Sequence, residues 1–210
     1  MNSTARFWDG IAEKYARSPI KDQTSYAYTL ERTASYLKST DRVLELGCGT
    51  GTTALKLAGG VAEIVATDVS SGMIAVAHRR AKEQGTQNVT FESCPAETPP
   101  QGPFDAALAF NLLHLVEDLD ATLQRARDSL KPGGLLISKT FCTPKGGASF
   151  KYRIMRVALP VMQFFGRAPF VRFISADELD RAVERAGFEL IERESFPQTD
   201  ARRFLVARRV

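Results

Sequence analysis

Short apolar runs alternate along this chain with longer segments whose apolar residues recur every three or four positions. The short runs predict buried strands, and the longer period predicts amphipathic helices. The strands predicted in the first two thirds of the chain are residues 42–46, 63–67, 88–93, 104–110 and 135–141. The helices predicted between them are residues 52–58, 72–84 and 119–130. Strands that alternate with helices in this way indicate a parallel α/β sheet.

The two ends of the chain follow other patterns. Residues 1–40 have helical character, and one helical face there would carry Phe7, Trp8, Ile11 and Tyr15. After an insertion at residues 143–174, a helix is predicted over 176–186, and strands over 188–196 and 203–209. The turn between these last strands is short, so we expect an antiparallel hairpin. With 210 residues, the chain can form a single domain with a substantial core.

Three alternate glycines, Gly47, Gly49 and Gly51, lie between the first predicted strand and the first helix of this alternation. Glycine lets the backbone turn sharply and approach a ligand closely, because no Cβ intrudes. The arrangement indicates a small molecule at the carboxyl edge of the sheet. The spacing differs from a dinucleotide fingerprint, which needs a glycine at the position of Thr52, and no Gly-Lys-Ser/Thr follows as in a Walker loop.

Asp68 ends the second predicted strand, about twenty residues after the glycines. A carboxylate there can accept hydrogen bonds from both hydroxyls of a ribose, although it could also cap the next helix. Ser70 and Ser71 are suitable caps for that helix. A ribose-bearing cofactor without a pyrophosphate is therefore favoured.

With these features the chain resembles the class I S-adenosylmethionine-dependent methyltransferases over nearly its whole length. Four segments carry the resemblance in the order of that family: residues 45–51 (ELGCGTG), 68–73 (DVSSGM), 104–108 (FDAAL) and 130–137 (LKPGGLLI). The resemblance implies a doubly wound, mostly parallel seven-stranded sheet with a C-terminal antiparallel hairpin. It implies S-adenosylmethionine as cofactor and S-adenosylhomocysteine as product. It also implies the parts of the single domain, which are an N-terminal helical cap (1–40), a cofactor-binding core (41–142), an acceptor lid (143–174) and a final helix with the hairpin (175–210).

The resemblance further implies which residues bind the cofactor. Asp68 would bind the ribose, Val69 and Met73 would flank the adenine, and Glu45 would face the methionine amino group. The expected set is Tyr15, Glu45, Gly47, Cys48, Gly49, Thr50, Gly51, Asp68, Val69, Met73, Ala96, Glu97 and Asn111. For Tyr15, packing on the core is the alternative, and for Trp8 we expect packing. Pro95 stands where many relatives have an acid for the adenine amino group, so the Ala96 backbone, Glu97 or water must replace it.

Methyl transfer asks little of side chains, because the sulfonium already makes the methyl group electrophilic. A general base is needed only if the acceptor carries a proton near neutral pH. The candidates are Asn111 and His114, which follow the fourth strand, and the alternative for His114 is packing. Family members that methylate exocyclic base nitrogens have an Asn/Asp-Pro-Pro-aromatic sequence here. The two prolines are missing from residues 111–114, which counts against a DNA-base or glutamine acceptor.

The insertion at residues 143–174 is the expected source of acceptor specificity. Residues 145–175 contain six basic residues and no acidic residue, with apolar residues between the basic ones. Three interpretations remain open: a helical lid packed on the sheet with its arginines in water, a pocket for a hydrophobic or anionic acceptor, and contact with an anionic membrane. Nucleic acid is a weaker candidate, because the aromatic residues are not interleaved as stacking platforms.

Composition restricts the remaining possibilities. The net charge of +4 is modest, and Cys48, Cys94 and Cys142 form no C-x-x-C pair, so we expect neither a metal site nor disulfides. The amino-terminal pattern is not that of a secretory signal, which favours the cytoplasm. We therefore expect a methyltransferase acting on a small molecule. The alternatives are a cofactor-binding module without transferase activity and, disfavoured by Thr52, a nicotinamide oxidoreductase.

Overall fold

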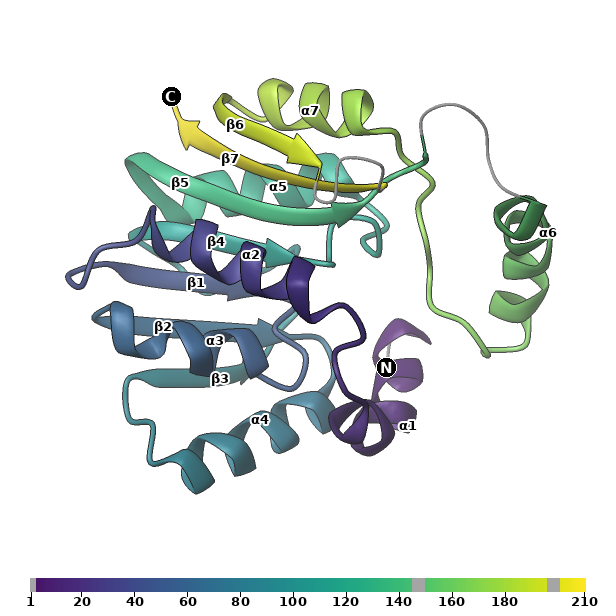
Figure 1. The fold of residues 1–210 in the computed structure, drawn as a ribbon, viewed down its shortest axis with the longest axis horizontal. Helices are drawn as coiled ribbons and strands as arrows, with labels where there is room; N and C mark the ends of the chain where they lie inside the picture. Colours follow the sequence, from purple (N-terminus) through teal and green to yellow (C-terminus); the bar gives the residue numbers. More distant parts are fainter. Residues whose placement is uncertain (1–2, 145–149, 196–200) are drawn as a thin grey trace.

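The computed structural model describes residues 3–144, 150–195 and 201–210. Its centre is a seven-stranded sheet with the order β3-β2-β1-β4-β5-β7-β6 (Figure 1). The strands β1 to β5 are parallel to one another, whereas β7 is antiparallel to both β5 and β6. The predicted mostly parallel sheet with a C-terminal antiparallel hairpin is therefore confirmed. The strands are β1 (Arg42–Leu46), β2 (Glu63–Asp68), β3 (Val89–Ser93), β4 (Phe104–Phe110), β5 (Leu130–Phe141), β6 (Phe188–Ser195) and β7 (Arg202–Arg209).

Helices cover both faces of the sheet. One buried cluster joins Val43 and Ile64 to the helices α3 and α4, with α2 at its margin. A second cluster joins Leu44 and Val65 to α5 and α7 on the opposite face. Burial on both faces explains why the strands form continuous apolar runs in the sequence. The helices are α1 (Ser3–Arg17), α2 (Gln23–Ala34), α3 (Thr52–Leu57) with the 3₁₀ turn η1 (Ala58–Gly60), α4 (Ser71–Gln84), α5 (Leu119–Ser129), α6 (Phe150–Phe164) and α7 (Ala176–Arg185).

The start of β5 differs from the prediction. Strand pairing begins at Leu130, opposite Phe104, and then shifts register so that Leu135 pairs with Ala106. The intervening residues 131–134 lie between the predicted helix (119–130) and the predicted strand (135–141). They instead form a bulge within the strand, where Gly133 adopts a φ of 76°.

Helix α1 lies at the carboxyl ends of the parallel strands, against the first turn of α4 (Figure 1). The Asp9 carboxylate accepts hydrogen bonds from the Gly72 backbone amide, at 2.8 Å, and from the Ser70 hydroxyl, at 2.7 Å. These bonds lower the pKa of Asp9. Ala12 contacts the flank of Gly72, where an added Cβ would lie 3.3 Å from the Ala12 Cβ. Small residues therefore let α1 approach α4 closely, and Ser70 also caps α4 by accepting from the Met73 amide, as predicted.

Helix α2 is joined to the C-terminal hairpin by polar contacts. The Tyr36 hydroxyl donates to Glu192 at 2.6 Å, and the Arg32 guanidinium forms an ion pair with the same carboxylate. Arg202 of β7 reaches Asp22, just before α2, at 2.7 Å. The position of α2 on the sheet thus depends on residues from the other end of the sequence.

Helix α6 lies beyond the carboxyl ends of the parallel strands, between β5 and α7 in the chain (Figure 1). Its polar side makes the local contacts: the Arg156 guanidinium lies over the Phe173 ring, and the Gln163 amide donates to the Pro169 carbonyl. Its apolar side is exposed, with Val157 76% and Phe164 85% accessible. Within the described residues, no helix combines the length and hydropathy that a membrane span requires.

Candidate active site

A cavity of 560 Å³ lies at the carboxyl edge of the parallel strands, between the glycine loop (residues 47–51), α1 and the loop from β4 to α5. Parallel strands direct the loops that follow them to one edge, which is where ligands bind in such sheets. The predicted cofactor residues that line the cavity are Tyr15, Glu45, Gly47, Cys48, Gly49, Thr50, Asp68, Val69, Met73, Ala96, Glu97 and Asn111. The structure thus brings together twelve residues that are dispersed in the sequence.

The glycine loop combines close packing with an open face. Gly47, Gly49 and Gly51 have φ values of 65°, 54° and 74°, which L residues with a side chain rarely adopt. An added Cβ at Gly51 would lie 2.7 Å from the Phe91 ring, so Gly51 packs against β3 and does not line the cavity. At Gly49 an added Cβ would meet no atom within 4 Å. Gly49 therefore leaves space on the cavity side that a ligand can fill.

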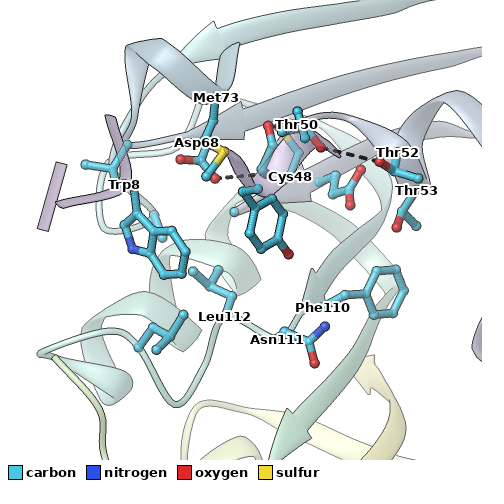
Figure 2. Close-up of a pocket in the computed structure, with 18 of the residues that line it drawn as sticks. Trp8, Cys48, Thr50, Thr52, Thr53, Asp68, Met73, Phe110, Asn111 and Leu112 are labelled. Carbon is cyan, nitrogen blue, oxygen red and sulfur yellow. Dashed lines mark hydrogen bonds between the residues drawn. The ribbon is translucent and has the colours of Figure 1, made fainter. Parts of the chain in front are cut away.

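Asp68, at the end of β2, joins the glycine loop to α4 (Figure 2). Its Oδ2 accepts from the Gly49 amide and its Oδ1 from the Ser70 amide, both at 2.9 Å. Burial raises the pKa of Asp68, and these two hydrogen bonds oppose that rise. Each carboxylate oxygen has a further lone pair, so the group can still accept ribose hydroxyls. Its position agrees with the predicted role and adds a structural one.

Glu45 is a buried carboxyl group in the cavity wall, with an exposed fraction of 2%. The Ala54 amide donates a hydrogen bond to it, whereas Oε2 has no partner among the described residues. Burial, together with the nearby Asp68, raises the pKa of Glu45 to about 8. An unpartnered carboxyl oxygen in a cavity wall is suited to a cationic group of a ligand.

Asn111 and His114 have different surroundings. Asn111 has a φ of 54°, a conformation that asparagine tolerates better than most residues. Its backbone N–H donates to the Lys139 carbonyl at 2.7 Å. It lines the cavity (Figure 2). His114 does not: its ring packs edge-on against Phe141 with 5.3 Å between centroids, and burial lowers its pKa to about 4. The structure therefore brings Asn111 into the site and places His114 in a packed position.

Several residues of the cavity wall were not among the predicted site residues. They include Trp8, Tyr26, Thr52, Thr53, Arg80, Leu112, Leu115, Val116 and Glu117. Trp8 was expected to pack on the core, but the buried face of α1 carries Ala5 and Ala12 instead. Trp8 and Tyr15 are seven residues apart, so they share a helical face, and their rings lie 6.2 Å apart. That spacing was the available signal for Trp8.

Tyr26 and Thr53 come from two helices and meet at the cavity wall. The Tyr26 hydroxyl lies 3.3 Å from the Thr53 Oγ1. Nothing local in the sequence indicates this pair, because it depends on how α2 packs beside α3. No group of three or more His, Cys, Asp or Glu side chains in the described part of the chain is arranged to hold a metal ion.

Comparisons with known proteins agree with this geometry. A family model described as a methyltransferase domain matches residues 20–193. The ubiquinone biosynthesis O-methyltransferase of Ruegeria pomeroyi is 30% identical over 159 residues, covering 74% of this chain and 62% of that protein. The chain thus spans less than two thirds of the length of this curated relative.

Two solved structures have a similar fold. The complex of DhpI with SAH has a TM-score of 0.75 at 23% identity, covering 99% of this chain and 95% of the other. The [4+2]-cyclase SpnF has a TM-score of 0.73 at 22% identity, covering 92% of this chain and 83% of the other. The family model, which spans the glycine loop, Asp68 and the β4–α5 loop, confirms the resemblance to class I methyltransferases. The chain belongs to the methyltransferase domain family.

Proposed function

We propose that this protein transfers a methyl group from S-adenosylmethionine to a small-molecule acceptor with an apolar part, such as a quinone precursor. One observation carries the proposal: the cavity joins an open glycine flank at Gly49 to the unpartnered Oε2 of Glu45 and to Asp68. These features fit a ligand with a ribose and a cationic amino acid end. When bound, S-adenosylmethionine supplies an electrophilic methyl group, so the protein chiefly binds, orients and excludes water.

Each residue of the site positions a different part of the ligand. Asp68 accepts the ribose hydroxyls while it keeps the Gly49 amide in place. Glu45 faces the amino group, and Val69 with Met73 forms an apolar wall beside the adenine. Asn111 can orient an acceptor by hydrogen bonds but cannot take its proton. A catalytic role for His114 stays a prediction that requires the imidazole to leave its packed position.

Part of the cavity wall is apolar, and we assign this part to the acceptor. It is formed by Trp8, Leu112, Leu115 and Val116, and Figure 2 shows Trp8 and Leu112 away from Thr52 and Thr53. The described part of the insertion contributes no residue to this wall. The relative from Ruegeria pomeroyi is named for ubiquinone biosynthesis, which supports an acceptor with a phenolic ring. We therefore propose that α1 and the β4–α5 loop contribute to acceptor selection, and the role of the insertion as an acceptor lid stays a prediction.

Calorimetry with S-adenosylhomocysteine and with NAD tests the cofactor. We expect binding of the former and none of the latter. Asp68→Ala should weaken that binding by about 1–3 kcal/mol, the scale of hydrogen bonds to a charged group. Binding of NAD alone would contradict the proposal, and an unchanged affinity in Asp68→Ala would remove Asp68 from the site.

Methyl transfer needs a separate test, because a protein named as a cyclase has a similar fold. The protein should be incubated with S-adenosylmethionine and a panel of phenols, with and without apolar side chains. Mass spectrometry should show a gain of one methylene unit, with faster turnover of the apolar phenols. Tight cofactor binding without turnover of any acceptor would favour the alternative of a binding module without transferase activity.

We also propose that α6 contacts an anionic membrane surface. The helix exposes Val157, Val161 and Phe164, and the insertion around it contains six basic residues and no acidic one between residues 145 and 175. Exposed apolar side chains beside basic ones are typical of helices that lie in the lipid interface. Such contact would place the cavity near an acceptor dissolved in the bilayer.

Co-sedimentation with vesicles tests this contact. The protein should bind phosphatidylglycerol vesicles more than phosphatidylcholine vesicles, and added salt should weaken the binding. The double variant Val157→Ser with Phe164→Ser should have an affinity for the vesicles that is lower by about tenfold or more. Its two replaced side chains no longer enter the lipid. Ile191→Ser, at an exposed apolar position on β6, is the control and should bind normally. Equal binding to both vesicle types would contradict the proposal.

A further inference from the structure

Arg80, on α4, connects three segments that surround the cavity. Its Nη2 donates to the Ala16 carbonyl of α1 at 2.6 Å. Its Nη1 donates to the Thr50 hydroxyl of the glycine loop at 2.7 Å and to the Thr52 hydroxyl at the start of α3 at 2.8 Å. The guanidinium has no carboxylate within ion-pair distance in the described ranges, and the acceptors of these hydrogen bonds are all neutral groups. The contacts of Arg80 therefore hold these three segments in position and do not neutralise a charge.

The acceptors of Arg80 have few other hydrogen-bond partners within the described residues. Ala16 lies in the last turn of α1, where carbonyl groups have no partner within the helix. The Thr50 side chain is buried, with an exposed fraction of 4%, and its hydroxyl lies 3.4 Å from that of Thr52. A planar guanidinium with several donors can satisfy these groups at once, which an ammonium cannot do in the same geometry.

Both structures that Arg80 connects line the same cavity. α1 contributes Trp8 and Tyr15, and the glycine loop contributes Gly49 and Thr50. A ligand in the cavity therefore touches α1 and the loop together. If the Arg80 side chain holds α1 and the glycine loop together, the docking of α1 and the conformation of the loop change together. A ligand that stabilises the docked α1 then also stabilises the loop conformation.

We propose that Arg80 is a positioning residue that couples the docking of α1 over the cavity to the conformation of the glycine loop. This inference rests on the proposed function only for the ligand that reports it. The neighbouring residue Arg79 offers a matched control. It also joins α4 to α1, through an ion pair with Glu13 at 3.0 Å, but it is exposed and contacts neither the loop nor the cavity.

Hydrogen exchange of the protein without ligand is the first test. In Arg80→Met, exchange should become faster in residues 3–17 and in residues 47–52 together, whereas Arg79→Met should change at most residues 3–17. The second test is calorimetry with S-adenosylhomocysteine. Arg80→Met should bind roughly 10- to 100-fold more weakly, the scale of lost hydrogen bonds from a charged group, and Arg79→Met within about twofold. Arg80→Lys should recover only part of the loss.

Thr52→Val removes one acceptor of Arg80 without changing the side-chain shape, and it serves if Arg80→Met folds poorly. Its effect on affinity should be smaller than that of Arg80→Met, and combining the two should add little, because both remove the same link. Faster exchange in α1 with an unchanged glycine loop in Arg80→Met would overturn the inference, as would equal losses of affinity in Arg79→Met and Arg80→Met. Absence of S-adenosylhomocysteine binding by the unaltered protein would instead contradict the proposed function, and the exchange test would still decide the role of Arg80.

Discussion

Cofactor binding at pH 7 should release close to one proton, and Glu45→Gln should abolish this release. The carboxyl group of Glu45 is buried, and no cation among the described residues contributes to its pKa of about 8, so it is largely protonated in the free protein at pH 7. A cationic ligand group beside it favours the charged form and lowers this pKa. Binding therefore exchanges a proton for a ligand cation.

The sign of the pH dependence follows from this exchange. Below the free-protein pKa of about 8, affinity should rise by up to tenfold per pH unit as pH increases, and it should level off above that pKa. Glu45→Gln should show no such slope from about pH 6 to 8, the range in which Glu45 changes its protonation on binding. The two proteins should bind alike at low pH and differ by about 1–3 kcal/mol at high pH.

Folding stability should change with pH in a related way. Because the pKa of Glu45 is raised in the folded state, its contribution is present below the unfolded pKa and is lost as pH rises through about 8. This loss falls between the ordinary pKa of 4.5 and about pH 8, so over that range Glu45→Gln should lose less stability in urea unfolding than the unaltered protein.

Calorimetry in two buffers with different ionisation enthalpies measures the proton release. Asp68, Cys48 and Tyr26 are the ionisable groups whose charge interacts with Glu45. Asp68→Asn is the control, because Asp68 also has a raised pKa, and this variant should still release the proton. Release that persists in Glu45→Gln but disappears in Asp68→Asn would assign the proton to Asp68.

Gly51→Ala should lower the free energy of unfolding by about 2–4 kcal/mol, because it adds backbone strain and a steric overlap. Its Cβ would lie 2.7 Å from the Phe91 ring and 2.9 Å from the Ala77 Cβ, at a φ of 74°. Gly49→Ala has the same kind of strain but no overlap, so we expect a loss of only about 1 kcal/mol. The two glycines therefore differ in what their missing side chains allow.

For ligand affinity we expect the opposite order, with the larger effect in Gly49→Ala. The methyl group of Gly49→Ala would enter the space left for the ligand, so its affinity for S-adenosylhomocysteine should fall about 10- to 100-fold. Urea unfolding and calorimetry on the same samples separate the two effects. Gly59→Ala is a control at an open position without a left-handed backbone, and it should be nearly neutral in both. Unchanged affinity in Gly49→Ala would show that the ligand does not approach this flank.

The features that could be predicted from the sequence are those encoded within short segments. The strands, the glycine loop and Asp68 follow from local apolar runs and from glycine spacing, and the structure places them together as predicted. The β4–α5 loop was predicted less well. The positive φ of Asn111 and the bond from the Leu115 amide to the Leu112 carbonyl turn this loop tightly, so that Leu112 and Leu115 line the cavity and His114 packs against Phe141.

Residues whose role depends on the packing of separate helices could not be found in this way. Arg80 lies among the charged residues of α4, and the approach of α1 through Ala12 and Gly72 adds Ala16 to its partners in the glycine loop and α3. Tyr26 is similar, since α2 must lie beside α3 before its hydroxyl reaches Thr53. Tertiary arrangement, which local propensity does not encode, determines these positions.

The bonds from α2 to Glu192 and Arg202 have a consequence for synthesis on the ribosome. Residues of α2 and its flanks are translated well before β6 and β7, the strands that hold the helix through Arg32, Tyr36 and Asp22. Domains generally acquire their final packing as the required segments become available. The wall of the cavity that Tyr26 forms should therefore be completed only after the β6–β7 hairpin has been translated. A nascent chain without this hairpin would have the glycine loop but not the whole binding site.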